Sequence, residues 1–223
     1  MSIIDNYYWT TNNMKIKSNY ILLITLISVF SVGCSSSKKT SPEEYQPKGL
    51  AVGTTIENFT AIDSKSVEYS LDKALESGPV VLIFIRGQWC PVCNKHMSLM
   101  QDSLQYIYEK GASLVVISPD KPEFIEKTIE KTGAEFTILY DESQKISDYF
   151  DVTFHPDGKT KLIYNSVLGA KLKEAHTDDS ERLPVPATFI INKDKKIIWR
   201  QFDIDYKNRS TVSEIIHHLP TNQ

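Results

Sequence analysis

The stretch Val80-Val-Leu-Ile-Phe-Ile-Arg-Gly-Gln-Trp-Cys-Pro-Val-Cys93 decides how the rest of the chain is organised. Its first six residues, 80–85, are all apolar, which is typical of a strand buried on both faces of a sheet. Beyond the second cysteine, apolar residues recur every three or four positions as far as Ile107, which predicts a helix with one apolar stripe. Pro91 suits the first turn of that helix. The sequence therefore predicts a Cys-x-x-Cys pair at a strand-to-helix junction, with Cys90 at the helix N-terminus.

This position of the cysteines points to redox chemistry. The partial positive charge at a helix N-terminus favours a thiolate, which is the nucleophile in disulfide exchange and in peroxide reduction. Cys90, Cys93 and His96 also have the spacing of a zinc half-site, but no fourth ligand is evident. Unreactive buried thiols are the other alternative. We interpret the pair as a redox-active dithiol that uses neither a metal nor an organic cofactor.

The composition limits the class of protein. A length of 223 residues allows one sizeable domain with extensions, and 41% hydrophobic and 24% charged residues are ordinary for a globular protein. The net charge of −3 and the pI of about 6.0 argue against a nucleic-acid partner. The sequence contains neither a Gly-rich phosphate loop nor a G-x-S-x-G motif.

The N-terminal region predicts export. The basic segment Met14-Lys-Ile-Lys17 precedes a mainly apolar run at 20–32, which is too short to span a membrane comfortably and suits a signal peptide. The run ends in Ser31-Val-Gly-Cys34, which resembles the lipobox of bacterial lipoprotein precursors but has Ser31 where leucine is usual. The resemblance implies a start at Met14 and lipidation of Cys34, which would leave two of the three cysteines as a pair. An uncleaved anchor helix and a free Cys34 are the alternatives.

These features divide the chain into three parts. We expect a signal peptide at 1–33, a lipidated cysteine with a flexible polar tether at 34–53, and the folded domain at 54–223. This organisation predicts a membrane-anchored lipoprotein of the cell envelope that faces the periplasm or the exterior.

The domain itself reads as alternating strands and helices. We expect strands at 59–62, 67–69, 80–85, 112–118, 136–140, 183–192 and 196–202, and helices at 70–75, from 91 to 110, at 122–131, 144–149 and 210–219. Ser70 and Ser210 are the expected N-caps of their helices, and Gly133 is an expected C-cap. Residues 150–182 are weakly patterned and long for a connection, which is uncommon unless the segment has a function.

This order of elements resembles the thioredoxin fold. Trp89-Cys-Pro-Val-Cys93 follows the first central strand, and Val185-Pro-Ala-Thr188 precedes the final hairpin. The resemblance implies an α/β fold with a central mixed β-sheet flanked by helices, here with an N-terminal strand extension. It also implies that Pro186 takes the place of the cis-proline that packs beside the active cysteines in that fold.

Three motifs narrow the resemblance to the peroxiredoxin-like proteins of the alkyl hydroperoxide reductase/thiol-specific antioxidant (AhpC/TSA) group. These motifs are Phe-x-Arg-Gly-x-Trp-Cys-Pro-x-Cys at 84–93, Leu-Pro-x-Pro-Ala at 183–187 and Asp-Tyr-x-x-Arg at 205–209. The resemblance implies antioxidant reduction of hydroperoxides, with an external thioredoxin-like thiol as reductant. The site that it implies consists of Cys90, Cys93, Trp89, Pro186 and, as a substitute cation, Arg86.

The chain departs from the peroxiredoxin pattern P-x-x-x-T/S-x-x-C. Alignment on the last cysteine puts Cys93 at the peroxidatic place, Cys90 at the Thr/Ser place and Arg86 at the Pro place. A second arginine of the family pocket would fall at Pro186. The pocket that aligns a peroxide is therefore incomplete or rebuilt, and Arg86 is either its cation or a surface charge at the end of the strand.

Several roles stay open on the sequence alone. Thioredoxin chemistry would make Cys90 the attacking sulfur, whereas peroxiredoxin chemistry would make Cys93 the oxidised one. His96 either tunes the pKa of a cysteine or is a helix-surface residue, and packing of the last helix is one role open to Tyr206 and Arg209. The alternatives for the whole protein are a thioredoxin-type disulfide reductase of the cell envelope and a non-enzymatic copper(I)-delivery module, because soft thiolates select that ion.

Overall fold

The central strand β3 (Val80–Phe84) explains the continuous apolar run. In the computed structural model, which describes residues 45–220, alternate side chains of β3 enter two different cores. Val81 and Ile83 belong to one core, whereas Leu82 and Phe84 belong to the other. Since successive side chains of a strand point to opposite faces, a strand buried on both faces needs an apolar residue at every position.

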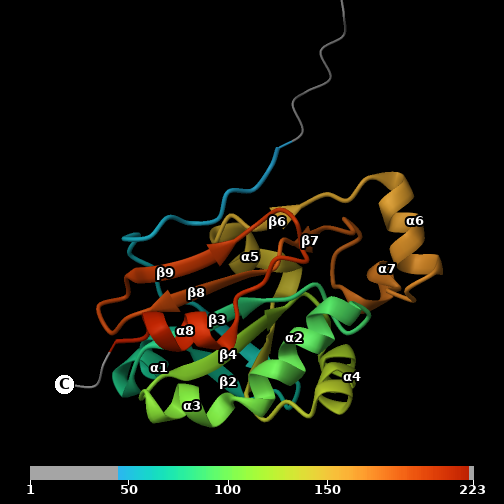
Figure 1. The fold of residues 1–223 in the computed structure, drawn as a ribbon. Coiled ribbons are helices and arrows are strands. Elements are labelled where there is room, and N and C mark those ends of the chain that lie inside the picture. Colours follow the sequence, from blue (N-terminus) through green and yellow to red (C-terminus); the bar gives the residue numbers. More distant parts are fainter. Residues whose placement is uncertain (1–44, 221–223) are drawn as a thin grey trace, which may run out of the picture. The chain divides into compact units, whose positions relative to one another are not determined.

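The main sheet has seven strands in the order β2-β1-β5-β4-β3-β8-β9 (Figure 1). The other strands are β1 (Thr60–Asp63), β2 (Glu68–Ser70), β4 (Ser113–Ser118), β5 (Thr137–Tyr140), β8 (Ala187–Ile191) and β9 (Ile197–Phe202). Strand β3 pairs parallel with β4 and antiparallel with β8, and β1 pairs antiparallel with β5. The mixed sheet and its N-terminal extension by β1 and β2 are thus as predicted.

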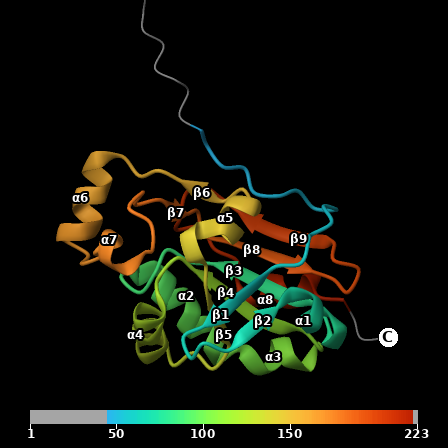
Figure 2. The same ribbon diagram turned by 180° about the vertical axis from the view of Figure 1, so that it is seen from behind.

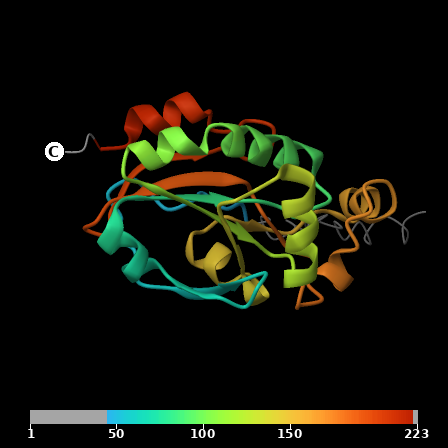
Figure 3. The same ribbon diagram turned by 90° about the horizontal axis from the view of Figure 1, so that it is seen from below.

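Helices cover both faces of this sheet. They are α1 (Leu71–Ser77), α2 (Pro91–Asp102), α3 (Leu104–Glu109), α4 (Pro122–Thr132), α5 (Lys145–Tyr149), α6 (Gly158–Ser166), α7 (Leu172–Ala175) and α8 (Val212–His218), with a short 3-10 helix η1 (Glu142–Gln144). Figure 3 shows α2, α3 and α8 on one side of the sheet and α1 on the other. Helix α5, gold in Figure 3, lies on the same side of the sheet as α1 and shares its core through Ile146.

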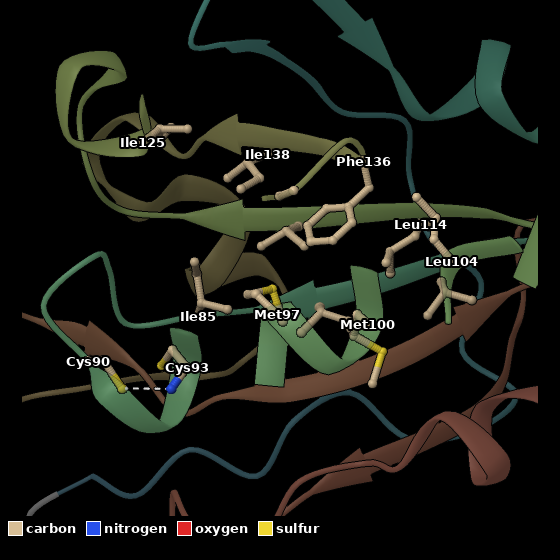
Figure 4. Close-up of a cluster of buried hydrophobic side chains, with 14 of the residues drawn as sticks. Ile85, Cys90, Cys93, Met97, Met100, Leu104, Leu114, Ile125, Phe136 and Ile138 are labelled. Atoms are coloured by element: carbon tan, nitrogen blue, oxygen red, sulfur yellow. Dashed lines mark hydrogen bonds between the residues drawn. The ribbon is translucent and has the colours of Figure 1, made fainter. Parts of the chain in front are cut away.

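The apolar stripe of α2 packs into the core beneath this helix layer. Met97 and Met100 are buried there against residues of α4 and of the strands, such as Ile125 and Ile138 (Figure 4). Cys90 and Cys93 belong to the same core, one helical turn before Met97. The apolar residues that recur every three or four positions therefore form the face by which α2 packs on the sheet.

Two predicted element boundaries are wrong. The helix that starts at Pro91 is interrupted at Ser103, whose φ of −121° separates α2 from α3. Helix α8 is capped by Thr211 in a capping box with Glu214, whereas Ser210 is buried with its hydroxyl 2.7 Å from that of Thr188. The predicted N-cap of α1 is confirmed, since Ser70 stands in that position, although its side chain makes no cap hydrogen bond.

The strand predicted at 183–192 is in fact two strands. Residues Leu183–Pro184 form β7, which pairs with β6 (Thr153–Phe154) in a separate two-stranded sheet. Val185 and Pro186 lie between β7 and β8, and the Val185 N–H donates to the carbonyl of Val152 (2.7 Å). The break directs the chain from residues 150–182 back to the central sheet.

Residues 45–53, which we assigned to the tether, instead pack on the domain. The Gly49 N–H donates to the carbonyl of Asp151 (2.8 Å), and the Arg200 guanidinium donates to the carbonyls of Lys48, Gly49 and Leu50 (2.7–2.9 Å). The compact unit accordingly begins at Tyr45. The predicted signal peptide and Cys34 lie outside the described residues. Within 45–220, no helix is long and apolar enough to cross a membrane.

Candidate active site

The two thiols lie at the start of α2, as the sequence predicted. Cys90 is the N-cap residue, and its sulfur accepts a hydrogen bond from the Cys93 N–H (3.3 Å; Figure 4). Both side chains are completely buried, and neither is in a disulfide. This places the two sulfurs on the first turn of one helix, where they are close enough to act as a pair.

Arg86 is part of the site and is not a surface charge, since its side chain is only 2% exposed. Its Nη2 donates to the Cys90 sulfur (3.3 Å), and its Nη1 donates to the hydroxyl of Tyr164 (2.9 Å). The guanidinium carbon lies 3.9 Å from the centre of the Tyr206 ring, within the range of a cation–π interaction. The indole of Trp89 packs on Tyr164, with 4.7 Å between ring centres.

Arg209 supplies a second guanidinium. Its Nη2 lies 3.5 Å from the Cys93 sulfur, and its Nε donates to the carbonyl of Tyr206. Tyr206 and Arg209 therefore do more than pack the last helix: one holds Arg86 and the other contacts Cys93. Each sulfur of the dithiol has its own arginine.

The surroundings of the two thiols shift their pKa values in opposite directions. Burial alone would raise the pKa of Cys93, but a hydrogen bond from Cys90 and the charges of Arg209 and Arg86 outweigh it and lower the pKa to about 5. The pKa of Cys90 is raised, because its proton is held in the hydrogen bond to Cys93 and because the thiol is buried. Both directions favour the thiolate at Cys93 over the thiolate at Cys90.

His96 is buried on α2, with 5% of its side chain exposed, and is not the helix-surface residue of our alternative interpretation. Its Nε2 lies 2.9 Å from the carbonyl of Ser210, which can only accept, so Nε2 carries the proton. Burial and the nearby Arg209 charge lower the pKa of His96 to about 4. The imidazole is thus neutral at pH 7, with Nδ1 as an acceptor that has no hydrogen-bond partner.

A groove of about 790 Å³ runs between α2 and the segment before α8. Its walls are apolar at Pro91, Val92, Leu99, Met100 and Val212. Every charged lining side chain is basic, namely Lys95, Lys207 and Arg209, and His96 is also part of the lining. Arg209 both lines the groove and contacts the Cys93 sulfur, whereas the two cysteines lie buried behind the groove wall.

The loop between β3 and α2 is fixed by a buried carboxylate. Asp120 accepts a hydrogen bond from the Gln88 N–H (2.8 Å) and lies directly against Gly87, whose φ is +121°. The other side of this carboxylate faces His176, at 3.4 Å. The segment 150–182 thus reaches the site twice, through Tyr164 beside Arg86 and through His176 beside Asp120.

Two predictions for the site remain, one on the position of Pro186 and one on metal binding. Pro186 is buried between β7 and β8, and its packing beside the cysteines stays a prediction. Among residues 45–220, no group of three or more His, Cys, Asp or Glu side chains is placed to hold a metal ion.

The sheet topology and the Cys-x-x-Cys at the start of α2 define a dithiol protein of the thioredoxin-fold class. The AhpC/TSA family model matches residues 52–200, and the chain belongs to that family. It is 30% identical over 167 residues to the chloroplastic peroxiredoxin Q of Populus jackii, covering 69% of this chain and 75% of that protein. It is 26% identical over 137 residues to the thiol-disulfide oxidoreductase ResA of Geobacillus kaustophilus, covering 58% and 78%.

Solved structures agree with this assignment at the level of the fold. Peroxidoxin BcpB from Mycobacterium tuberculosis superposes with a TM-score of 0.57 at 21% identity, covering 78% of this chain and 97% of that chain. A peroxiredoxin-like protein from Aquifex aeolicus superposes with a TM-score of 0.58 at 17% identity, covering 77% and 87%.

Proposed function

We propose that this protein is a thiol-dependent oxidoreductase that reduces hydroperoxides through Cys93 and Cys90. The observation that carries the proposal is the asymmetry of the dithiol. The Arg209 contact and the hydrogen bond from Cys90 lower the pKa of Cys93 to about 5, so this sulfur is a thiolate at neutral pH. The Cys90 thiol keeps its proton and is placed to act second.

The reaction then has three balanced steps. The Cys93 thiolate attacks the terminal oxygen of ROOH, so that a sulfur–oxygen bond forms, the oxygen–oxygen bond breaks, and the alkoxide leaves and takes a proton to become an alcohol. Cys90 next attacks the sulfenic acid on Cys93, forming the disulfide and releasing water that carries the proton of the Cys90 thiol. An external dithiol of the thioredoxin kind then reduces this disulfide and is itself oxidised to a disulfide.

Reduction of protein disulfides is the second candidate function. It is supported by the N-cap position of Cys90 and by the likeness to thiol-disulfide oxidoreductases such as ResA. In that reaction Cys90 attacks a substrate disulfide and Cys93 resolves the mixed disulfide. The same two residues are used in the opposite order.

A pair of assays on the unit Tyr45–Gln223 distinguishes the two reactions. We expect consumption of hydrogen peroxide and of an organic hydroperoxide with a thioredoxin system as reductant, and much slower reduction of insulin disulfides. Fast insulin reduction without peroxide consumption would favour the second function. Binding of copper(I) by the reduced protein without either activity would favour the metal-delivery alternative.

We further propose that the protein acts at a membrane, as a lipoprotein held through Cys34 with its domain on the periplasmic or outer side. The support is the basic and apolar N-terminal sequence followed by Ser31-Val-Gly-Cys34. Its reductant would be an external thiol partner in the same compartment.

A further inference from the structure

Helix α6 has one face turned inward and one face without a partner among the described residues. On the inner face, Tyr164 contacts Arg86, the side-chain oxygen of Asn165 accepts from the Leu172 N–H (2.9 Å), and Lys161 pairs with Glu181 (3.6 Å). Asp157 caps the helix by accepting from the Lys159 and Thr160 N–H groups. The helix is therefore well formed, although it lies at the outer edge of the compact unit (Figures 1 and 2).

The outer face of α6 is apolar. Leu162, Ile163 and Val167 are 66%, 52% and 75% exposed, and the neighbouring Leu168 is also exposed. We call these four residues the α6 patch. On a helix with 3.6 residues per turn, Leu162 lies nearly opposite Tyr164 and Ile163 lies between the two, whereas Val167 is the C-cap residue of the helix. Single exposed apolar residues are ordinary on a protein surface, but a contiguous group of large ones marks an interaction surface.

The charges around the α6 patch are complementary to an anionic surface. Between Gly158 and Lys173 the chain has four lysines and no acidic residue, and Asp157 and Glu174 stand at the two ends of this segment. Of these lysines, Lys159, Lys171 and Lys173 are exposed, and Lys171 pairs with Glu174 (3.0 Å) just beyond the segment. Apolar side chains surrounded by lysines are the combination that binds the interface of anionic lipids. A second copy of the chain fits less well, since it would bring the same lysines face to face.

We propose that the α6 patch docks this domain onto an anionic lipid surface. Leu162, Ile163 and Val167 would enter the boundary between headgroups and acyl chains, while the lysines contact the headgroup phosphates. Since Tyr164 on the same helix holds Arg86, docking brings the dithiol close to the lipid. This surface lies within the domain, so it is independent of the lipid predicted at Cys34, and it does not depend on which reaction the dithiol performs.

The test uses the unit Tyr45–Gln223, which contains both cores and lacks the predicted lipid attachment site. The fragment is sedimented with phosphatidylcholine vesicles that contain or lack phosphatidylglycerol. We expect it to bind only the anionic vesicles, with binding that weakens as salt is raised. The double variant Leu162→Ser/Ile163→Ser should lose at least about tenfold in partitioning, because two large aliphatic side chains no longer enter the lipid.

The control is the double variant Val67→Ser/Ile204→Ser, which removes two equally exposed apolar residues from other parts of the surface. It should bind like the parent, and circular dichroism should show that both double variants are folded. The proposal is overturned if the parent does not bind anionic vesicles, or if both double variants bind equally well. It is also overturned if sedimentation velocity shows a dimer that Leu162→Ser/Ile163→Ser dissociates, since a second copy would then cover the α6 patch.

Discussion

At the scale of single residues, the dithiol is contacted by two arginines that come from distant parts of the chain, Arg86, which is buried, and Arg209, which is half-buried. Arg86 follows β3 and contacts Cys90, and Arg209 precedes α8 and contacts Cys93. A buried guanidinium needs compensation, and Arg86 obtains it from the sulfur, from the Tyr164 hydroxyl and from the Tyr206 ring. These contacts hold Arg86 beside Cys90, at the Pro place of the peroxiredoxin pattern.

Replacing Arg209 should change how the reaction depends on pH. With the pKa of Cys93 lowered to about 5, the rate of oxidation by peroxide should be constant above about pH 6 and should fall as the thiolate is protonated near pH 5. The variant Arg209→Gln removes a cation beside the sulfur, which should raise the pKa of Cys93 by about 1 to 3. Stopped-flow oxidation rates between pH 4 and about pH 9 measure this directly.

Arg182→Gln is the matched control, because Arg182 forms its ion pairs with Asp148 and Asp178, away from the dithiol. It should leave the pH profile unchanged. An unchanged profile in Arg209→Gln would mean that this arginine does not determine the charge of Cys93.

The residues of the site that the sequence predicted are those in local motifs. Trp89, Cys90 and Cys93 stand together in one stretch, and their chemistry follows from the strand-to-helix change around them. The contacts of Tyr164 and Arg209 could not be predicted, since they depend on how distant segments pack. The only signal was indirect: residues 150–182 were too long for a connection, and Arg209 belonged to a motif without a known role.

At the scale of elements, the loop between β3 and α2 is the part most sensitive to substitution. A Cβ added at Gly87 would lie 2.6 Å from the Asp120 carboxylate, and the φ of +121° is one that L residues rarely adopt. Gly87→Ala should therefore lower the free energy of unfolding by about 1–3 kcal/mol and displace Arg86 and Cys90. Urea denaturation and the peroxide assay measure the two effects.

Gly158→Ala is the control for this substitution, because a Cβ at the start of α6 meets nothing within 4 Å. It should be neutral or slightly stabilising. A Gly87→Ala protein as stable and as active as this control would show that the loop does not need its close approach to Asp120.

The elements that the sequence predicted well are those in which packing requires apolar residues at a regular spacing. The strands β3 and β4 and the stripe of α2 were evident because their buried faces admit only apolar residues. The breaks at Ser103 and after Pro184 were not evident, since apolar residues continue on both sides of each break. The N-cap of α8 was misplaced by one residue because Ser210 and Thr211 are both good caps, and only the burial of Ser210 decides between them.

At the scale of the whole molecule, residues 45–53 belong to the domain. Starting the chain at Thr54 in place of Tyr45 removes the three carbonyls that accept from Arg200 and the backbone bonds of Gly49 and Leu50. The shorter fragment should lose about 2–4 kcal/mol of stability by urea denaturation. Arg200→Gln in the longer fragment should reproduce much of this loss. Equal stability of the two fragments would show that residues 45–53 belong to the flexible tether and not to the folded domain.

The proposed anchor is also a property of the whole molecule. In the full chain, Cys34→Ser should release the protein from the membrane fraction, because stable anchoring requires two or more acyl chains and the α6 patch alone binds reversibly. Fractionation is done at high salt, because salt weakens the lysine contacts of the α6 patch and leaves only anchoring through Cys34. Retention of Cys34→Ser in the membrane fraction under those conditions would argue against lipidation at this cysteine.

The central claim is that Cys93 is the sulfur that peroxide oxidises, and sulfenic-acid trapping on the two single cysteine variants tests it most directly. Each variant of the Tyr45–Gln223 unit is treated with stoichiometric hydrogen peroxide in the presence of a sulfenic-acid-specific label, and the labelled residue is located by mass spectrometry. We predict that Cys90→Ser is labelled on Cys93 and that Cys93→Ser is not labelled. Label on Cys90 in Cys93→Ser, with none on Cys93 in Cys90→Ser, would contradict the assignment and make Cys90 the attacking sulfur.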